Sequence, residues 1–170
     1  MRRRFKAGSA GANPSEPQDP DQAARLAAVA LLARRDFATG ELAARLHDDG
    51  HPAAAVAAAI ADLTAGRILD DDRFASQYVA YHAGRGQGPH RIARDLAQRG
   101  VAAVHIETAL AAGTDWAALA REVRIRRFGL KPPESWAEKA KQRRFLQYRG
   151  FSSDHIRSAL GPDIESEDLS

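Results

Sequence analysis

The sequence has no cysteine, few aromatic residues and no long apolar run. Without cysteine, its 170 residues can form neither a disulfide framework nor a zinc site with thiolate ligands, which is compatible with a reducing compartment. No stretch has the 18 consecutive apolar residues of a membrane-spanning helix, and no apolar run of signal-peptide length follows the basic start MRRRFKAGSA. We therefore expect a cytoplasmic protein that is neither exported nor embedded in a membrane.

The apolar residues that are present favour helices. They make up 44% of the chain, but many of them are alanine and only 6% of all residues are aromatic, so large core side chains are few. Alanine favours helix over strand, and no stretch shows sustained strand alternation. We predict an all-α fold. Residues 1–20 are basic and rich in glycine and proline, so we predict a disordered arm there, and residues 162–170 form an acidic tail.

Charge is distributed unevenly along the chain, although the net charge is only +3. Residues 21–70 carry 5 basic and 7 acidic side chains, whereas residues 114–161 carry 11 basic and 5 acidic ones. A basic surface of this kind favours a polyanionic or acidic partner. Simple solvation of the charges is the competing interpretation, because arginine outnumbers lysine 21 to 4, which a coding bias also produces.

Three segments align without a gap at a period of 50 residues. They are LAARLHDDGHPAAAVAAAI (42–60), IARDLAQRGVAAVHIETAL (92–110) and QRRFLQYRGFSSDHIRSAL (142–160). Within each segment, apolar residues spaced by four on either side of a glycine lie on one helical face. Three copies of one pattern indicate one structural unit used three times. The glycines that fall in register are Gly50, Gly100 and Gly150.

Each unit is predicted to contain three helices. The aligned glycine separates the second helix from the third, where a residue that tolerates positive φ is needed. A further helical segment precedes each block, at about residues 21–35, 72–84 and 115–128, and each begins near an aspartate suited to capping. We predict an elongated, curved array of three tandem repeats, with repeat one at 21–69, repeat two at 70–113 and the basic repeat three at 114–161.

The stretch YHAGRGQGPHRI (81–92) places three glycines at alternate positions before a proline. A dinucleotide-binding loop needs a preceding strand, and a nucleoside-triphosphate loop needs Gly-Lys-Ser/Thr, neither of which is present. Gly88 is followed by Pro89, which suits the first position of a helix. We interpret the stretch as a structural joint between two helices that also lies within reach of a partner.

No group of residues predicts catalysis or a metal centre. Asp70, Asp71 and Asp72 resemble a carboxylate cluster for a metal ion, but they precede a predicted helix, where acidic caps are expected. The six histidines form no HExxH pattern, and no serine, threonine or acid pair stands out as a nucleophile or an acid and base. We therefore predict a binding protein with no enzymatic activity, cofactor or metal.

The basic faces are the candidate contact surface. In the predicted helix after Pro89, Arg91 and Arg94 lie on the side opposite Ile92 and Leu96. Arginine side chains in such positions suit bidentate contacts with carboxylates or phosphates. The candidate partner-binding residues are Arg85, Arg91, Arg94, Arg124, Arg127, Lys139, Arg143 and Arg144.

The same region resembles the RecX family of recombinase regulators. ILDDDRFASQYVAYHAGRGQGPHRIARDLAQRGV (68–101) contains that family's central L-D-D-x-R-F-A and G-x-G-P-x-R-I motifs, and LLARRDFATGELAARLHDDG (31–50) and KQRRFLQYRGF (141–151) resemble its first-repeat and third-repeat signatures. The resemblance covers about residues 25–161. The sequence departs from the pattern at Gln142, because the equivalent position is apolar in the other two repeats.

This resemblance implies a cytoplasmic, non-enzymatic protein that binds the RecA recombinase filament and modulates, by inhibition, its ATPase and strand-exchange activities. The alternative is a helical-repeat protein that acts directly on DNA, because paired helices around a glycine turn resemble helix-turn-helix units. Against it, the third helices of repeats one and two carry no arginine or lysine. A weak direct contact with DNA stays open. We expect a monomer, because the sequence has no heptad seam or large apolar stripe.

Overall fold

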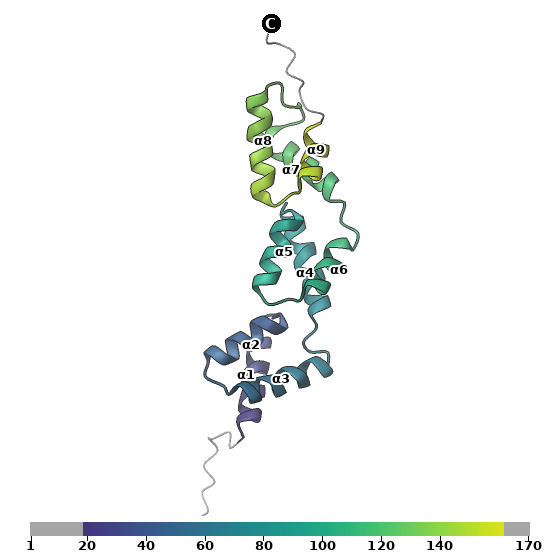
Figure 1. Ribbon diagram of the computed structural model, residues 1–170. Coiled ribbons are helices and arrows are strands. Elements are labelled where there is room, and N and C mark those ends of the chain that lie inside the picture. The colour runs from purple at the N-terminus through teal and green to yellow at the C-terminus, as the bar shows by residue number, and fades with distance from the viewer. Residues whose placement is uncertain (1–18, 162–170) are drawn as a thin grey trace, which may run out of the picture.

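The computed structural model describes residues 19–161, and within this range the chain forms nine α-helices and no strand. The predicted all-α class is confirmed. The helices form three tiers stacked along one long axis, with the first tier at the bottom of Figure 1 and the third at the top. Nearly all of the predicted N-terminal arm and the whole acidic tail lie outside the described residues.

The first tier comprises α1 (Pro20–Leu32), α2 (Thr39–Asp48) and α3 (Ala53–Ala65). Asp19 caps α1 by accepting a hydrogen bond from the Asp21 amide, as its position before the helix favours. The first helix packs mainly on the third, and α2 covers their apolar seam. The buried cluster at the centre of the tier consists of Ala28, Phe37, Leu42, Leu46, Val56, Leu63 and Leu69.

The second and third tiers repeat this arrangement. The second comprises α4 (Asp71–Gly84), α5 (Pro89–Gln98) and α6 (Ala103–Ala111), and the third comprises α7 (Trp116–Phe128), α8 (Trp136–Arg149) and α9 (Ser153–Leu160). Each tier has its own small core, so no single central core holds the described residues together. In Figure 1 the second helices α2, α5 and α8 follow one another along the same edge of the stack.

The turn after each second helix has the same geometry. Gly50, Gly100 and Gly150 have φ values of 90°, 77° and 94°, the left-handed region expected for these joints. The amide that follows each glycine donates to the carbonyl of an aligned leucine, at 3.1 to 3.2 Å. This pairing satisfies carbonyl groups that the helix end would otherwise leave open. None of the helices in residues 19–161 is long and apolar enough to cross a membrane.

Candidate partner-binding surface and repeat junctions

The start of α2 rests directly on the glycine turn of the second tier. A Cβ atom added at Gly40 would lie 2.8 Å from the Gly100 Cα, so the two backbones are in close contact. Ala38, just before α2, is part of the second tier's buried cluster. The first junction therefore depends on glycine at both Gly40 and Gly100.

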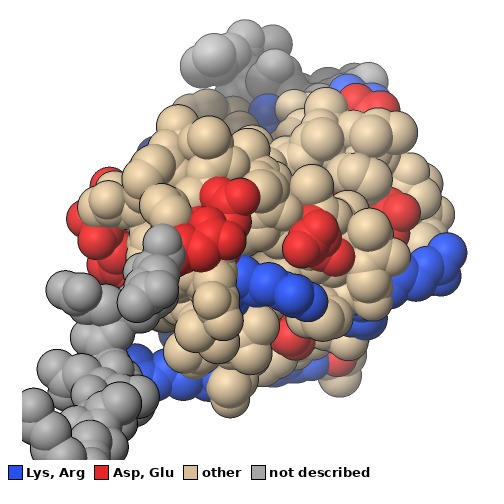
Figure 2. Space-filling model, turned by 90° about the horizontal axis from the view of Figure 1, so that it is seen from below, with Lys and Arg blue, Asp and Glu red and all other residues tan. Residues whose placement is uncertain are grey.

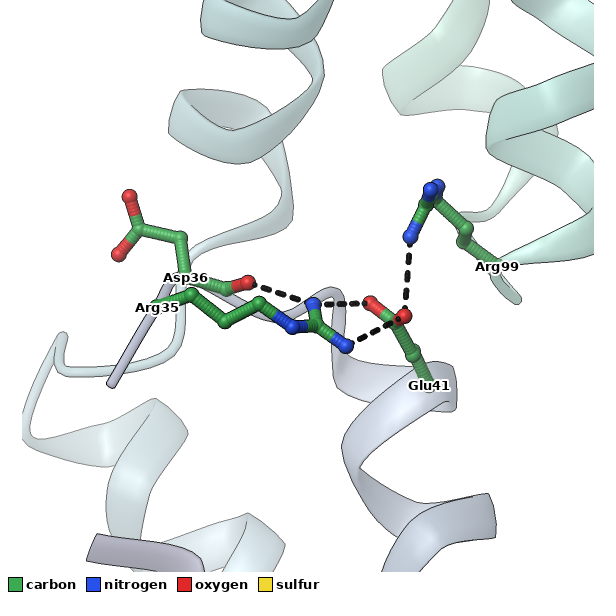
Figure 3. Close-up of polar contacts among 4 residues, drawn as sticks. All are labelled: Arg35, Asp36, Glu41 and Arg99. Atoms are coloured by element: carbon green, nitrogen blue, oxygen red, sulfur yellow. Dashed lines mark hydrogen bonds and ion pairs between the residues drawn. The ribbon is translucent and has the colours of Figure 1, made fainter. Parts of the chain in front are cut away.

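Charged groups close the same junction (Figure 3). The Arg35 guanidinium donates to both Glu41 carboxylate oxygens, at 2.9 and 3.1 Å. Arg99, from the second tier, donates to one of them at 2.9 Å. The Glu41 side chain is only 21% exposed, which reduces the screening of these pairs by water. One carboxylate thus joins an arginine from each of two tiers.

The three aspartates at the start of α4 have structural partners. Asp70 is the N-cap of α4 and accepts from the Arg73 amide at 2.9 Å, a hydrogen bond that lowers the pKa of its carboxyl. Asp71 accepts from the Thr39 amide at 2.8 Å, across the first junction, and Asp72 pairs with His105 at 2.6 Å. Among residues 19–161, no group of three potential ligand side chains is placed to hold a metal ion.

The second junction uses backbone contacts at the equivalent positions. The Gly88 amide donates to the Arg149 carbonyl at 2.8 Å, and the His90 amide donates to the Gly150 carbonyl at 3.0 Å. A Cβ atom at Gly88 would overlap the Gly150 backbone. The φ of Gly88 is −86°, a value that any residue can adopt. Glycine is therefore needed at this position for the close approach of the two backbones, and not for an unusual conformation. Pro89 occupies the first turn of α5, as predicted.

An arginine-rich pocket lies beside the second junction. Its volume is about 150 Å³. Arg149 reaches across the junction and donates to the Arg85 carbonyl at 3.2 Å. Arg85 also donates to the hydroxyl of Tyr81, an aromatic residue that is 60% exposed. The pocket is lined by Arg85, Gly86, Val123, Arg126, Arg127, Phe145 and Arg149.

Six of the eight predicted contact residues are exposed or half-buried, and they form three groups. Arg85 and Arg127 come together at this pocket, although they lie in different repeats. Arg91 is half-buried and does not line the pocket; its guanidinium lies 5.7 Å from the Tyr148 ring centre. The remaining exposed candidates lie along α5 and α8 and are Arg94, Arg143 and Arg144.

The prediction of Arg124 and Lys139 as surface contacts is wrong, because each is only 5% exposed. Arg124 points into the third tier, where it donates to the Lys131 and Leu130 carbonyls at 3.0 and 3.3 Å. It also reaches the Gln142 side-chain oxygen at 3.5 Å. The departure at Gln142 thus supplies an acceptor for a buried cation.

Helical spacing accounts for the burial of Lys139. The buried residues of α8 are Lys139, Gln142 and Leu146, which are separated by three and four positions and so share one face. The sequence contained this signal, because Leu146 is an aligned apolar position. The charge of Lys139 favours the surface, but the long aliphatic part of a lysine packs readily on apolar surface.

Basic candidates are concentrated away from the first tier. Figure 2 looks along the long axis from the repeat-one end, with Asp and Glu side chains across the middle of this face and Lys and Arg mainly below them. This mixture agrees with the excess of acidic residues in 21–70. The candidate surface therefore belongs to the second and third tiers.

The stack of similar three-helix tiers, joined at glycine turns, defines a tandem helical-repeat protein. Family models for RecX match it twice, with the second three-helix domain at residues 70–110 and the third at 114–160. A regulatory protein RecX from Halorhodospira halophila is 43% identical, covering 91% of this chain and 96% of the relative. Another, from Pseudomonas fluorescens strain Pf-5, is 40% identical over 81% and 90%. The chain belongs to the RecX family of regulatory proteins.

Two solved structures share the fold. A crystal structure of a regulatory protein RecX has a TM-score of 0.70 and 23% identity, covering 83% of this chain and 71% of that one. The crystal structure of RecX from Lactobacillus salivarius has a TM-score of 0.72 and 20% identity, covering 82% and 94%. The resemblance found in the motifs is therefore confirmed, and so is the repeat architecture it implied.

Proposed function

We propose that this protein binds RecA recombinase filaments on DNA and lowers their ATPase and strand-exchange activities during recombination and DNA repair. The observation that carries the proposal is the match over nine-tenths of the chain to a relative named regulatory protein RecX. The family motifs at residues 68–101 and 141–151 imply the recombinase as the partner.

The shape of the molecule supports a filament as the partner. The three tiers extend along one axis (Figure 1), so successive tiers can meet successive subunits of a polymer. Exposed arginines on α5 and α8 are suited to carboxylates on those subunits. In this proposal the protein acts in the cytoplasm as a bound monomer and changes recombinase activity by association, with no turnover of its own.

Charge reversal at Arg94 and Arg144 tests the contact surface. Both side chains are exposed, so Arg94→Glu/Arg144→Glu should leave the fold intact. We expect binding to recombinase filaments on single-stranded DNA to weaken about tenfold, because two attractive contacts become repulsive. The matched control is Arg25→Glu/Arg34→Glu, with the same charge change on exposed residues of the first tier.

Filament binding and filament ATPase are measured together, with circular dichroism as the check on folding. Wild-type protein that leaves both the filament and its ATPase unchanged would contradict the proposed function. Equal losses in the test and control variants would show that overall charge, and not this surface, governs binding. Binding to naked DNA, measured beside it, decides the alternative: a protein that binds DNA alone as tightly as filaments acts on DNA directly.

A further inference from the structure

The two repeat junctions use equivalent positions but different charges. At a period of 50 residues, Arg35 corresponds to Arg85, and Arg99 corresponds to Arg149. In each pair, one arginine lies just before the second helix of a tier, and the other lies at the end of the second helix of the next tier. The position between them differs, because the third residue of α2 is Glu41 and the third residue of α5 is Arg91.

At the first junction a carboxylate satisfies both arginines. Glu41 accepts from Arg35 and from Arg99, each at 2.9 Å (Figure 3). The guanidinium groups of both arginines thus bind one acidic side chain that belongs to the same protein. This arrangement is a precedent, within the same chain, for a carboxylate between two arginines at these positions.

At the second junction, no carboxylate from residues 19–161 takes this place. Arg91 stands in the place of Glu41 and turns toward the Tyr148 ring, with its Nε buried and without a hydrogen-bond partner. Arg85 and Arg149 line the pocket of about 150 Å³, together with Arg126 and Arg127. Within the described part of the chain no acidic residue lines it, although Glu122 forms an ion pair with Arg126 at its edge. The pocket is therefore strongly electropositive.

We propose that the arginine pocket between repeats two and three binds an aspartate or glutamate side chain of a protein partner, in the role that Glu41 has between repeats one and two. The inference concerns the chemistry of the contact and stands on contacts within this chain, whatever protein supplies the acid. Binding there would join the second and third tiers through one carboxylate, as Glu41 joins the first and second.

The lining favours an acidic side chain over a nucleic-acid phosphate. Val123 and Phe145 provide apolar surface for the methylene groups that carry a side-chain carboxylate, while the arginines take its oxygens in bidentate pairs. The volume suits one amino-acid side chain and is well below the roughly 300 Å³ at which small-molecule sites begin. The first junction supplies the precedent for a carboxylate between these arginine positions.

The first experiment places an acid beside the pocket, at the position that corresponds to Glu41. Arg91→Glu restores the charge pattern of the first junction, so its carboxylate should pair with Arg85 and Arg149. We expect its melting temperature to exceed that of Arg91→Gln by about 3 °C. Arg91→Gln is the matched control, because it removes the same half-buried guanidinium without adding an acid. Melting of Arg91→Glu at or below the temperature of Arg91→Gln would overturn the proposal.

The second experiment measures the ligand directly, without any recombinase. The probe is a fluorescein-labelled oligoglutamate peptide, followed by anisotropy at low salt. We expect Arg126→Gln/Arg127→Gln to weaken its binding about tenfold, and Arg91→Glu to weaken it as well. The control is Arg121→Gln/Arg157→Gln, which removes two exposed arginines of the same tier outside the pocket. Equal weakening in test and control would overturn the proposal.

An oligothymidylate of the same charge, measured in the same buffer, distinguishes the two classes of partner. If the pocket variants weaken binding of the oligonucleotide but not of the peptide, the pocket takes a backbone phosphate and the proposal fails. Because filaments are absent from these measurements, their outcome is separate from that of the proposed function: a chain that never binds filaments can still bind the peptide through this pocket.

Discussion

Arg124 holds the loop between α7 and α8 through its guanidinium group. Its two terminal nitrogens donate to the carbonyls of Leu130 and Lys131, in a loop where two prolines prevent helix. A buried cation is tolerated only where hydrogen bonds replace water, and these carbonyls and Gln142 provide them. At the scale of single residues, an arginine that the sequence offers as a contact therefore serves the fold.

Replacing Arg124 tests this structural role. We expect Arg124→Ala to lower the free energy of unfolding by about 2 kcal/mol, because two loop carbonyls and Gln142 lose their charged donor. Arg144→Ala, on the exposed side of the next helix, should change it by less than about 0.5 kcal/mol. Urea unfolding of both variants measures the difference. Equal, small losses would show that the Arg124 hydrogen bonds contribute nothing to the third tier.

At the scale of helices, the glycine turns have two separate requirements. Gly50 and Gly100 both end a second helix with positive φ, which disfavours any other residue. Nothing lies within 4 Å of a Cβ atom built at Gly50, whereas one at Gly100 would meet the Gly40 backbone. The first turn therefore needs only an unusual conformation, and the second needs that conformation and the space of a missing side chain.

The pair Gly50→Ala and Gly100→Ala separates these requirements. We expect Gly50→Ala to lower the free energy of unfolding by about 1 kcal/mol, from positive φ alone. Gly100→Ala should lower it by at least about 1 kcal/mol more, because the first junction must open to admit the methyl group. Thermal unfolding of both variants provides the comparison. If the two midpoints fall equally, the close approach of Gly40 to Gly100 has no energetic role.

At the scale of the whole molecule, stability is spread over three small cores and the junctions between them. The elongated stack exposes more surface than a compact body of the same length, and its tiers touch only their neighbours (Figure 1). Two histidines, His82 in α4 and His155 in α9, are partly buried, and this partial burial lowers the pKa of each imidazole below its usual value.

The lowered pKa values predict a loss of stability in mild acid. A histidine kept neutral in the folded state takes up its proton more readily after unfolding, so stability is complete above about pH 6.5 and falls as the pH drops below it. His82→Gln should reduce this pH dependence. His47→Gln, at an exposed position, is the control. Melting temperatures at pH 7.5 and 5.5 measure the effect, and an unchanged pH dependence in His82→Gln would contradict it.

The sequence alone determined the helical class, the repeating unit and the family. These follow from local features, namely apolar residues spaced along one helical face, acidic caps and a glycine where each second helix ends. Such features act within a few residues and recur at a fixed period, so they are visible without tertiary structure. The family motifs are equally local.

Only the tertiary structure decided which cations face solvent and which gather together. Arg124 is buried because α7 turns that face inward, a consequence of packing between α7 and α8. Arg85 and Arg127 share a pocket although 42 positions separate them, because α5 rests on the Gly150 turn. The pocket exists only where two tiers meet, and that meeting depends on backbone contacts between residues far apart in the chain, which no local pattern specifies.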